Sequence, residues 1–240
     1  MSNQISYFKT VENFEKSSFS SHNKLQLDFD YQIMNEQKCN AFCSSLSNCT
    51  NISSLTLQIG CNRVDDQKAS QIGAALANCK NLRKLTVWLS YNMIDSQGIS
   101  NFGFSLIGCN NLTELSLALA ENKIGSEGAS NLGEALSSYK HLEILTVNLF
   151  QNNILEQGAS KLIEALTNSI SLKSLTLGLN GNKIQTQNSS GLVTHLARFK
   201  RLQHLSIDLR KNNIDLSQEK QMKRNIKKIL KLVQQHITFY

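Results

Sequence analysis

Six cysteines are the side chains of this 240-residue chain best suited to chemistry, because a thiol can bind a metal, form a disulfide or act as a nucleophile. They are Cys39, Cys43, Cys49, Cys61, Cys79 and Cys109. Three of them are spaced 30 residues apart, namely Cys49, Cys79 and Cys109. The same position of later repeats holds Tyr139, Ser169 and Phe199. A position that exchanges Cys for aromatic residues is typical of core packing, where a free thiol behaves as a small hydrophobe. We therefore expect structural thiols in a reducing compartment.

Cys39 and Cys43 have the i,i+4 spacing that could bring two metal ligands together on a helix. No second pair of Cys or His with ligand spacing accompanies them, so the sequence predicts no metal site. An even cysteine count is also typical of disulfides in secreted proteins. The first sixteen residues, MSNQISYFKTVENFEK, are polar and contain no apolar run, so no secretory signal peptide is predicted. We expect a cytoplasmic protein with free thiols.

The histidines and carboxylates do not form a catalytic pattern. The histidines are scattered along the chain, at His22, His141, His195, His204 and His236. The acidic pair Asp65–Asp66 is better explained by helix capping than by acid–base catalysis. The sequence also lacks a GxxxxGK[ST] phosphate loop, a GxSxG nucleophile motif and an HExxH zinc motif. It therefore predicts no enzyme activity and no cofactor.

The net charge of +7 is concentrated at the C-terminal end, since residues 1–197 carry −1 and residues 198–240 carry +8. One predicted helix carries Lys220, Lys223, Arg224, Lys227, Lys228 and Lys231. These residues form either a solvated face or a docking surface for an acidic protein tail, nucleic acid or an anionic membrane. Aromatic residues do not alternate with them, which argues against sequence-specific nucleic-acid binding. No apolar run is long enough for a transmembrane segment.

An internal repeat must position all of these residues. Six blocks align without a gap and begin 30 residues apart, at Asn51, Asn81, Asn111, His141, Ser171 and Arg201. A seventh, degenerate copy covers residues 24–34. Apolar residues first occupy every second position, which predicts a strand with one buried face. They then recur at helical spacing, as in Ala129, Leu132 and Leu136, which predicts a helix. Because each repeat runs in the same direction, the strands must be parallel.

Two polar positions recur with the repeat. An Asn follows each strand, at Asn62, Asn92, Asn122, Asn152, Asn182 and Asn212. A buried amide at this position can satisfy backbone groups of adjacent turns, so we expect an Asn ladder. Four positions at the start of the helices are the expected N-caps, namely Asp66, Ser96, Ser126 and Thr186.

One repeat follows the motif L-x-x-L-x-L-x-x-N-x-L, then a Gly and two helical leucines, apart from one extra L-x step before the Asn. Its residues are Leu112, Leu115, Leu117, Asn122, Ile124, Gly128, Leu132 and Leu136. This pattern resembles the leucine-rich repeat family, in particular its ribonuclease-inhibitor-like subtype. The resemblance implies an α/β fold, a curved solenoid or horseshoe with parallel strands on the concave face and helices on the convex face. An extra L-x step before the Asn departs from the family motif and should lengthen each strand by roughly 7 Å.

A stack of repeats leaves an apolar surface at each end that must be covered. The chain is therefore divided into an N-terminal cap at 1–21, an array of about seven 30-residue repeats at 22–216, and a basic C-terminal capping helix at 217–240. The first cap is expected to be a short amphipathic helix containing Phe8, Val11 and Phe14. The apolar stripe of the last helix is expected to extend from Met222 to Ile237.

The outward side chains of the concave strands have no role in the core, so they are available for binding. The candidate partner-binding residues, on these columns and just beyond the strands, are Trp88, Tyr91, Asn148, Phe150, Asp208 and Arg210. Trp88 and Phe150 lie two strands apart, about 10 Å, which predicts an apolar trough with aromatic walls. Aromatic anchors dominate interface hot spots. The alternative is that these rings pack under a loop or the N-terminal cap.

We therefore expect a non-catalytic scaffold that binds a partner protein through its concave sheet, although the fold alone does not choose the partner. One alternative is a structural subunit of a large cytoskeletal or ciliary assembly. Another is a GTPase-activating regulator, because one branch with this repeat type activates a small GTPase. No residue of this sequence marks that branch.

Overall fold

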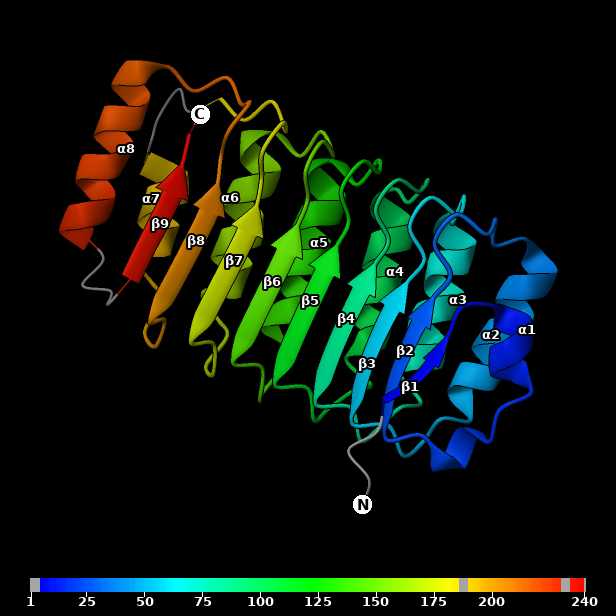
Figure 1. Cartoon of the computed structure of the whole chain (residues 1–240). Coiled ribbons are helices and arrows are strands. Elements are labelled where there is room, and N and C mark those ends of the chain that lie inside the picture. The colour runs from blue at the N-terminus through cyan, green and yellow to red at the C-terminus, as the bar shows by residue number, and fades with distance from the viewer. Residues whose placement is uncertain (1–4, 186–189, 230–233, 240) are drawn as a thin grey trace.

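The computed structural model describes residues 5–185, 190–229 and 234–239. Over these residues nine strands form a single parallel sheet, in the order of the sequence (Figure 1). The strands are Ile5–Phe8 (β1), Lys24–Asp28 (β2), Ser54–Gln58 (β3), Lys84–Trp88 (β4), Glu114–Ala118 (β5), Ile144–Asn148 (β6), Ser174–Gly178 (β7), His204–Asp208 (β8) and Gln234–Thr238 (β9).

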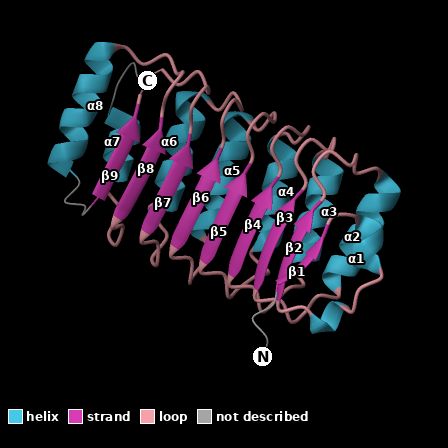
Figure 2. Ribbon diagram, viewed as in Figure 1, coloured by secondary structure: helices cyan, strands magenta, loops and turns pink. Residues whose placement is uncertain are grey.

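The helices all lie on one side of this sheet (Figure 2). They are Val11–Glu15 (α1), Glu36–Ser47 (α2), Asp66–Leu76 (α3), Ser96–Leu106 (α4), Gly125–Ser137 (α5), Leu155–Leu166 (α6), Ser190–Leu196 (α7) and Leu216–Ile229 (α8), with a short 3-10 helix at Phe19–Ser21 (η1). None of the helices within the described ranges has both the length and the apolar character needed to cross a membrane.

The core lies between the sheet and the helices. Leu115 and Leu117 of β5 are at most 2% exposed, and they pair in register with Leu85 and Val87 of β4. A helix is about 10 Å wide whereas strands are about 4.8 Å apart, so the helical side of the stack is the longer one. The chain is thus a curved leucine-rich repeat solenoid, with parallel strands on the concave face and helices on the convex face, which confirms the predicted fold class.

The predicted Asn ladder is confirmed. The Asn92 Oδ1 atom accepts hydrogen bonds from the backbone N–H groups of Asn62 (3.1 Å) and Val64 (2.9 Å). Its Nδ2 atom donates to the carbonyls of Ile59 (3.0 Å) and Leu89 (2.9 Å). Each ladder Asn therefore satisfies backbone groups of its own turn and of the preceding turn, which lie out of reach of water along most of the array.

The residue before each ladder position has a left-handed backbone, which the sequence analysis did not predict. The residues are Tyr31, Cys61, Tyr91, Glu121, Gln151, Gly181 and Lys211, with φ between 50° and 68°. A left-handed conformation costs a residue other than glycine about 1–2 kcal/mol. The array accepts this strain in every turn because the sharp change of direction sends the next side chain into the core.

The helix N-caps lie earlier than predicted. Asp65 and Asp95 have extended backbones, and their carboxylates accept hydrogen bonds from N–H groups of the first turns of α3 and α4. The residues expected in this role were Asp66, Ser96, Ser126 and Thr186. The first three lie inside α3, α4 and α5, where the backbone is already helical, so those predictions are wrong. Thr186 lies outside the described residues.

The C-terminal segment differs from the expected single helix. The helix α8 is followed by β9, which pairs with β8 and places Ile237 beside Ile207. The expectation of a helical stripe that reaches Ile237 is therefore wrong. An unpaired sheet edge exposes a row of N–H and C=O groups, and a terminal strand satisfies them whereas a helix would not.

The N-terminal segment contains the expected short helix, α1, but Phe8 lies in a strand, β1, and the 3-10 helix η1 follows. Phe14 is fully buried, and its ring centroid lies 5.6 Å from that of Phe8 and 6.3 Å from that of Phe42 in α2. Val11 is also buried. The aromatic side chains of this segment thus pack against the first helix of the array.

Candidate functional site

Three large aromatic side chains are exposed within three successive turns of the solenoid. Trp88, the last residue of β4, is 44% exposed, and Tyr91 is 57% exposed. Tyr31 occupies the column of Tyr91 two repeats earlier and is 78% exposed. Rings of this size normally contribute to a core or an interface, so their exposure together marks a candidate binding surface.

The three rings line one pocket of about 190 Å³ at the carboxyl ends of the strands. Its other lining residues are Asp30, Gly60, Cys61, Ser90 and Ala118. Gly60 and Ala118 carry little or no side chain, so the space between the larger groups stays open. We call these eight residues the aromatic pocket.

Tyr31, Cys61 and Tyr91 are consecutive members of the left-handed column, with φ values of 61°, 55° and 58°. The neighbouring Cys61 thiol raises the pKa of the Tyr31 hydroxyl by hydrogen bonding, and Asp30 and Tyr91 add smaller effects in the same direction. All three side chains line the aromatic pocket.

Asp30 supplies the carboxylate of the aromatic pocket. Its Oδ1 atom accepts a hydrogen bond from the Gly60 N–H group at 2.5 Å, which fixes the carboxylate beside the floor of the pocket. Partial burial raises the Asp30 pKa, with a smaller contribution from Asp28 in the same direction. Asp28 in turn accepts a hydrogen bond from the Tyr7 hydroxyl at 3.0 Å. Two carboxylates thus lie at the N-terminal end of the concave face.

Phe150 does not line the aromatic pocket. Its ring lies against Gly181, where an added Cβ atom would come within 3.1 Å of the ring. The Lys211 Nζ atom lies 5.6 Å from the ring centroid. The structure therefore groups Trp88 with Tyr91 and Tyr31, and Phe150 with residues of the next two repeats, instead of joining Trp88 and Phe150 in one trough.

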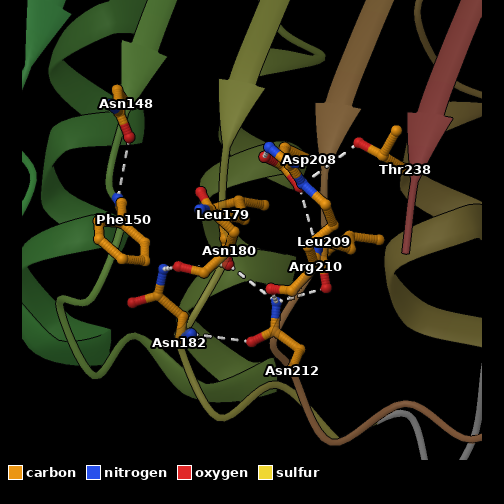
Figure 3. A network of polar contacts seen from close by, with 10 residues as sticks. All are labelled: Asn148, Phe150, Leu179, Asn180, Asn182, Asp208, Leu209, Arg210, Asn212 and Thr238. Atoms are coloured by element: carbon orange, nitrogen blue, oxygen red, sulfur yellow. Dashed lines mark hydrogen bonds and ion pairs between the residues drawn. The ribbon is translucent and has the colours of Figure 1, made fainter. Parts of the chain in front are cut away.

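Asn148, Asp208 and Arg210 form local contacts in the C-terminal half of the sheet (Figure 3). The Asn148 Oδ1 atom accepts a hydrogen bond from the Phe150 N–H group at 3.0 Å. Asp208 and Arg210 form a two-point ion pair, with Nε–Oδ1 and Nη2–Oδ2 distances of 2.9 and 2.6 Å. Hydrogen bonding to Arg210 lowers the Asp208 pKa. These side chains are exposed or half-buried, but their polar groups already bind one another.

The basic helix α8 carries Lys220, Lys223 and Arg224 with exposed side chains. Lys223 forms an ion pair with Glu219, and its Nζ atom lies 5.3 Å from the centroid of the Phe239 ring. Lys223 therefore helps to hold the chain end against the helix. Lys227 and Lys228 also belong to α8, and Lys231 lies outside the described residues.

Apart from Cys61, which lines the aromatic pocket, the cysteines occupy two environments. Burial raises the pKa of Cys49 to about 12 and that of Cys109 to about 11, and it raises the Cys79 pKa as well. These three thiols form the packing column that the repeat predicted. The Cys39 and Cys43 Sγ atoms lie 3.9 Å apart on α2. Over the described ranges, no three Cys, His, Asp or Glu side chains gather closely enough to hold a metal ion.

Comparisons with known proteins add little to this picture. No family model matches the chain, and no curated protein matches it. Among solved structures, it is similar to the tropomodulin C-terminal domain of Caenorhabditis elegans, at 9% identity over 66% of this chain and 90% of that one, with a TM-score of 0.48. It is also similar to a protein of Bacteroides fragilis, at 12% identity over 96% of this chain and 69% of that one, with a TM-score of 0.45. At such low identity neither neighbour indicates what this chain binds.

Tyr31 and Asp30 supply a ring and the carboxylate of the pocket, and the sequence analysis did not select either for binding. Both belong to the degenerate first copy of the repeat, where the motif is hardest to align. The signal was nevertheless present, because Tyr31, Cys61 and Tyr91 are separated by 30 residues each. Alignment of this copy beyond the strand would have placed a second tyrosine in the column of Tyr91.

Proposed function

We propose that this chain is a non-catalytic protein–protein interaction module that binds a partner protein through its concave sheet surface. The supporting observation is the exposure of Tyr31, Trp88 and Tyr91 around one pocket on that surface. Burying such rings against a partner would release their apolar area from water, at about 25 cal/mol per Å². We also propose that the array is a variant of the ribonuclease-inhibitor-like subtype.

Native co-purification followed by mass spectrometry, with the wild-type chain and two variants, tests this proposal. In Trp88→Ala the loss of a hot-spot ring should weaken capture of the partner by about 2 kcal/mol or more, which is about 30-fold in affinity. Phe104→Ala is the matched control, because Phe104 is a 46% exposed ring on α4 at the helical face. Its capture of the partner should equal that of the wild type.

The opposite pattern would favour the second candidate, a structural subunit of a cytoskeletal or ciliary assembly. Such a subunit should co-purify in fixed stoichiometry and depend on convex or terminal surfaces. Capture that is lost in Phe104→Ala and retained in Trp88→Ala would therefore contradict binding through the concave face.

The basic helix α8 supports an additional proposal, that an acidic partner segment docks at the C-terminal end. Lys220 and Arg224 are exposed on it. Since exposed ion pairs weaken as salt increases, capture through this helix should decline when the ionic strength is raised. Charge reversal in Lys220→Glu combined with Arg224→Glu should then abolish that salt dependence, whereas an unchanged salt dependence would show that α8 is only a solvated cap.

A further inference from the structure

The lining of the aromatic pocket combines aromatic rings with a carboxylate. The faces of Trp and Tyr rings carry negative electrostatic potential, and they attract ammonium and guanidinium groups. Asp30 adds a formal negative charge beside the three rings. At about 190 Å³ the pocket is smaller than the roughly 300–1,000 Å³ of pockets that take drug-sized molecules. Its size and chemistry match a single cationic side chain.

In the C-terminal half of the same sheet, a carboxylate and an aromatic ring each contact a cation. Asp208 occupies the column of Asp28, and its carboxylate is paired with the guanidinium of Arg210. Phe150, a half-buried ring of that half, has the Lys211 ammonium group above it. In this half, therefore, both the carboxylate and the ring are matched by cations of the chain itself.

The N-terminal half has the same kinds of group without those cations. Arg210 lies two residues after Asp208 of β8, and the corresponding residue two positions after Asp28 of β2 is Asp30. A second carboxylate thus replaces the guanidinium. Among the residues that the structure describes, neither Asp28 nor Asp30 has a Lys, Arg or His within ion-pair distance. Lys9 lies 5.9 Å from the ring centroid of Tyr7, which does not line the pocket.

The left-handed column holds both tyrosine rings outside the core. Tyr31 and Tyr91 are bulky residues with φ values of 61° and 58°, a conformation that glycine or asparagine adopts with less strain. Their rings are largely exposed, so burial within the chain does not compensate for the strain. Glu121, Gln151 and Lys211 share this conformation, so the repeat sets the backbone. The exposure of two large rings is what distinguishes the positions of Tyr31 and Tyr91.

We propose that the aromatic pocket binds an arginine or lysine side chain of a basic partner segment, held between the rings of Tyr31, Trp88 and Tyr91 and neutralised by Asp30. This inference rests on the proposed function, and it specifies the chemistry of the partner. The pocket then selects the partner by charge as well as by apolar area.

The pentapeptide acetyl-Gly-Gly-Arg-Gly-Gly-amide is a direct probe, and the same peptide with citrulline in place of arginine is its neutral match. Trp88 is the only Trp of the chain, so its fluorescence reports on this pocket. We expect saturable binding in the millimolar range, at least about fivefold tighter for the arginine peptide. Equal affinity for the two peptides, or no saturable change of fluorescence with either, would overturn the inference.

Two variants and one control test which residues cause the preference for the arginine peptide. Asp30→Asn removes the charge but keeps an oxygen for the Gly60 N–H group, and it should abolish the preference for arginine over citrulline. Tyr31→Gly removes a ring at a position whose φ suits glycine, so the protein should fold while arginine affinity falls at least about threefold. Asp208→Asn makes the same charge change in the other half of the sheet. If it reduced the preference as much as Asp30→Asn, the attraction would be a general effect of net charge, and the inference would fail.

The failure of this inference can be distinguished from the failure of the proposed function. One outcome is that Trp88→Ala abolishes capture of the native partner, while Asp30→Asn changes neither capture nor the preference for the arginine peptide. The chain would then still be an interaction module, but its ligand would not be a cationic side chain. If capture is independent of Trp88, the proposed function itself is wrong.

Discussion

The two halves of the concave face share one backbone and differ in what their side chains do. From β2 to β5, exposed rings and the Asp30 carboxylate surround an open pocket. From β6 to β8, the equivalent side chains bind one another, as in the Asp208–Arg210 pair. Strand register, Asn ladder and left-handed column are the same in both halves. The solenoid thus fixes the positions, and only the residue types in the outward columns distinguish a binding surface from a self-satisfied one.

The largest effect should come from the core, where we expect no difference between the halves. Leu57→Ala in β3 and Leu177→Ala in β7 each remove a fully buried side chain and should destabilise the protein by about 2–5 kcal/mol. Urea unfolding measures both losses. The half-buried Thr56→Ser is a control that should stay within about 0.5 kcal/mol. A loss confined to one half would mean that the halves differ in packing as well as in surface.

The Asn ladder should distinguish the middle of the array from its C-terminal end. Asn92→Ala leaves buried N–H and C=O groups without partners, at about 1–3 kcal/mol for each group. Asn212 forms equivalent hydrogen bonds but is only half-buried, so water can replace part of what Asn212→Ala removes. Thermal unfolding should show the larger decrease for Asn92→Ala. Equal decreases would indicate that the end of the array is as dry as its middle.

The left-handed column allows opposite substitutions in the two halves. Tyr91→Gly should raise stability by up to about 1 kcal/mol because it removes backbone strain, while partner capture declines. Gly181→Ala should lower stability by about 1 kcal/mol because it introduces the same strain at φ of 68°. Differential scanning calorimetry compares the two. A destabilised Tyr91→Gly variant would show that the tyrosine ring supports the fold, which contradicts its assignment to binding.

The smallest effect concerns the thiol column, which is confined to the N-terminal half. Burial holds the pKa of Cys109 at about 11, above its ordinary value of 9.0. As the pH rises above 9.0, the unfolded chain therefore loses this proton while the folded chain keeps it, and stability falls until about pH 11. The decline of the urea midpoint over this interval should be shallower in Cys109→Ala. Ser169→Ala, in the same column of the other half, should leave this decline unchanged. An equal decline in the wild type and both variants would contradict the burial of the Cys109 thiol.

Much of the fold could be predicted from the sequence because its decisive patterns are local and repeated. The alternation of Leu115 and Leu117 with outward residues fixes a strand, and the 30-residue period fixes parallel pairing in register. The strand at residues 234–238 was missed because Ile237 fits helical spacing as well as alternation. Its conformation was decided by the unpaired edge of β8, which does not appear in a local pattern.

The candidate site was predicted in part. Sequence columns identified Trp88 and Tyr91 as outward residues, and both are exposed in one pocket. They could not show that the ring of Phe150 lies against Gly181, away from that pocket, because the direction of a side chain at a strand end depends on its neighbours.

By itself the sequence determined the solenoid, its buried ladder and the side chains available on its inner face, because each follows from residue types at fixed spacing. Only the tertiary structure decided that Tyr31, Trp88 and Tyr91 share a pocket with Asp30, while Asp208 is already neutralised by Arg210. These groupings depend on contacts between turns about 30 residues apart and on a left-handed backbone that no single residue type specifies.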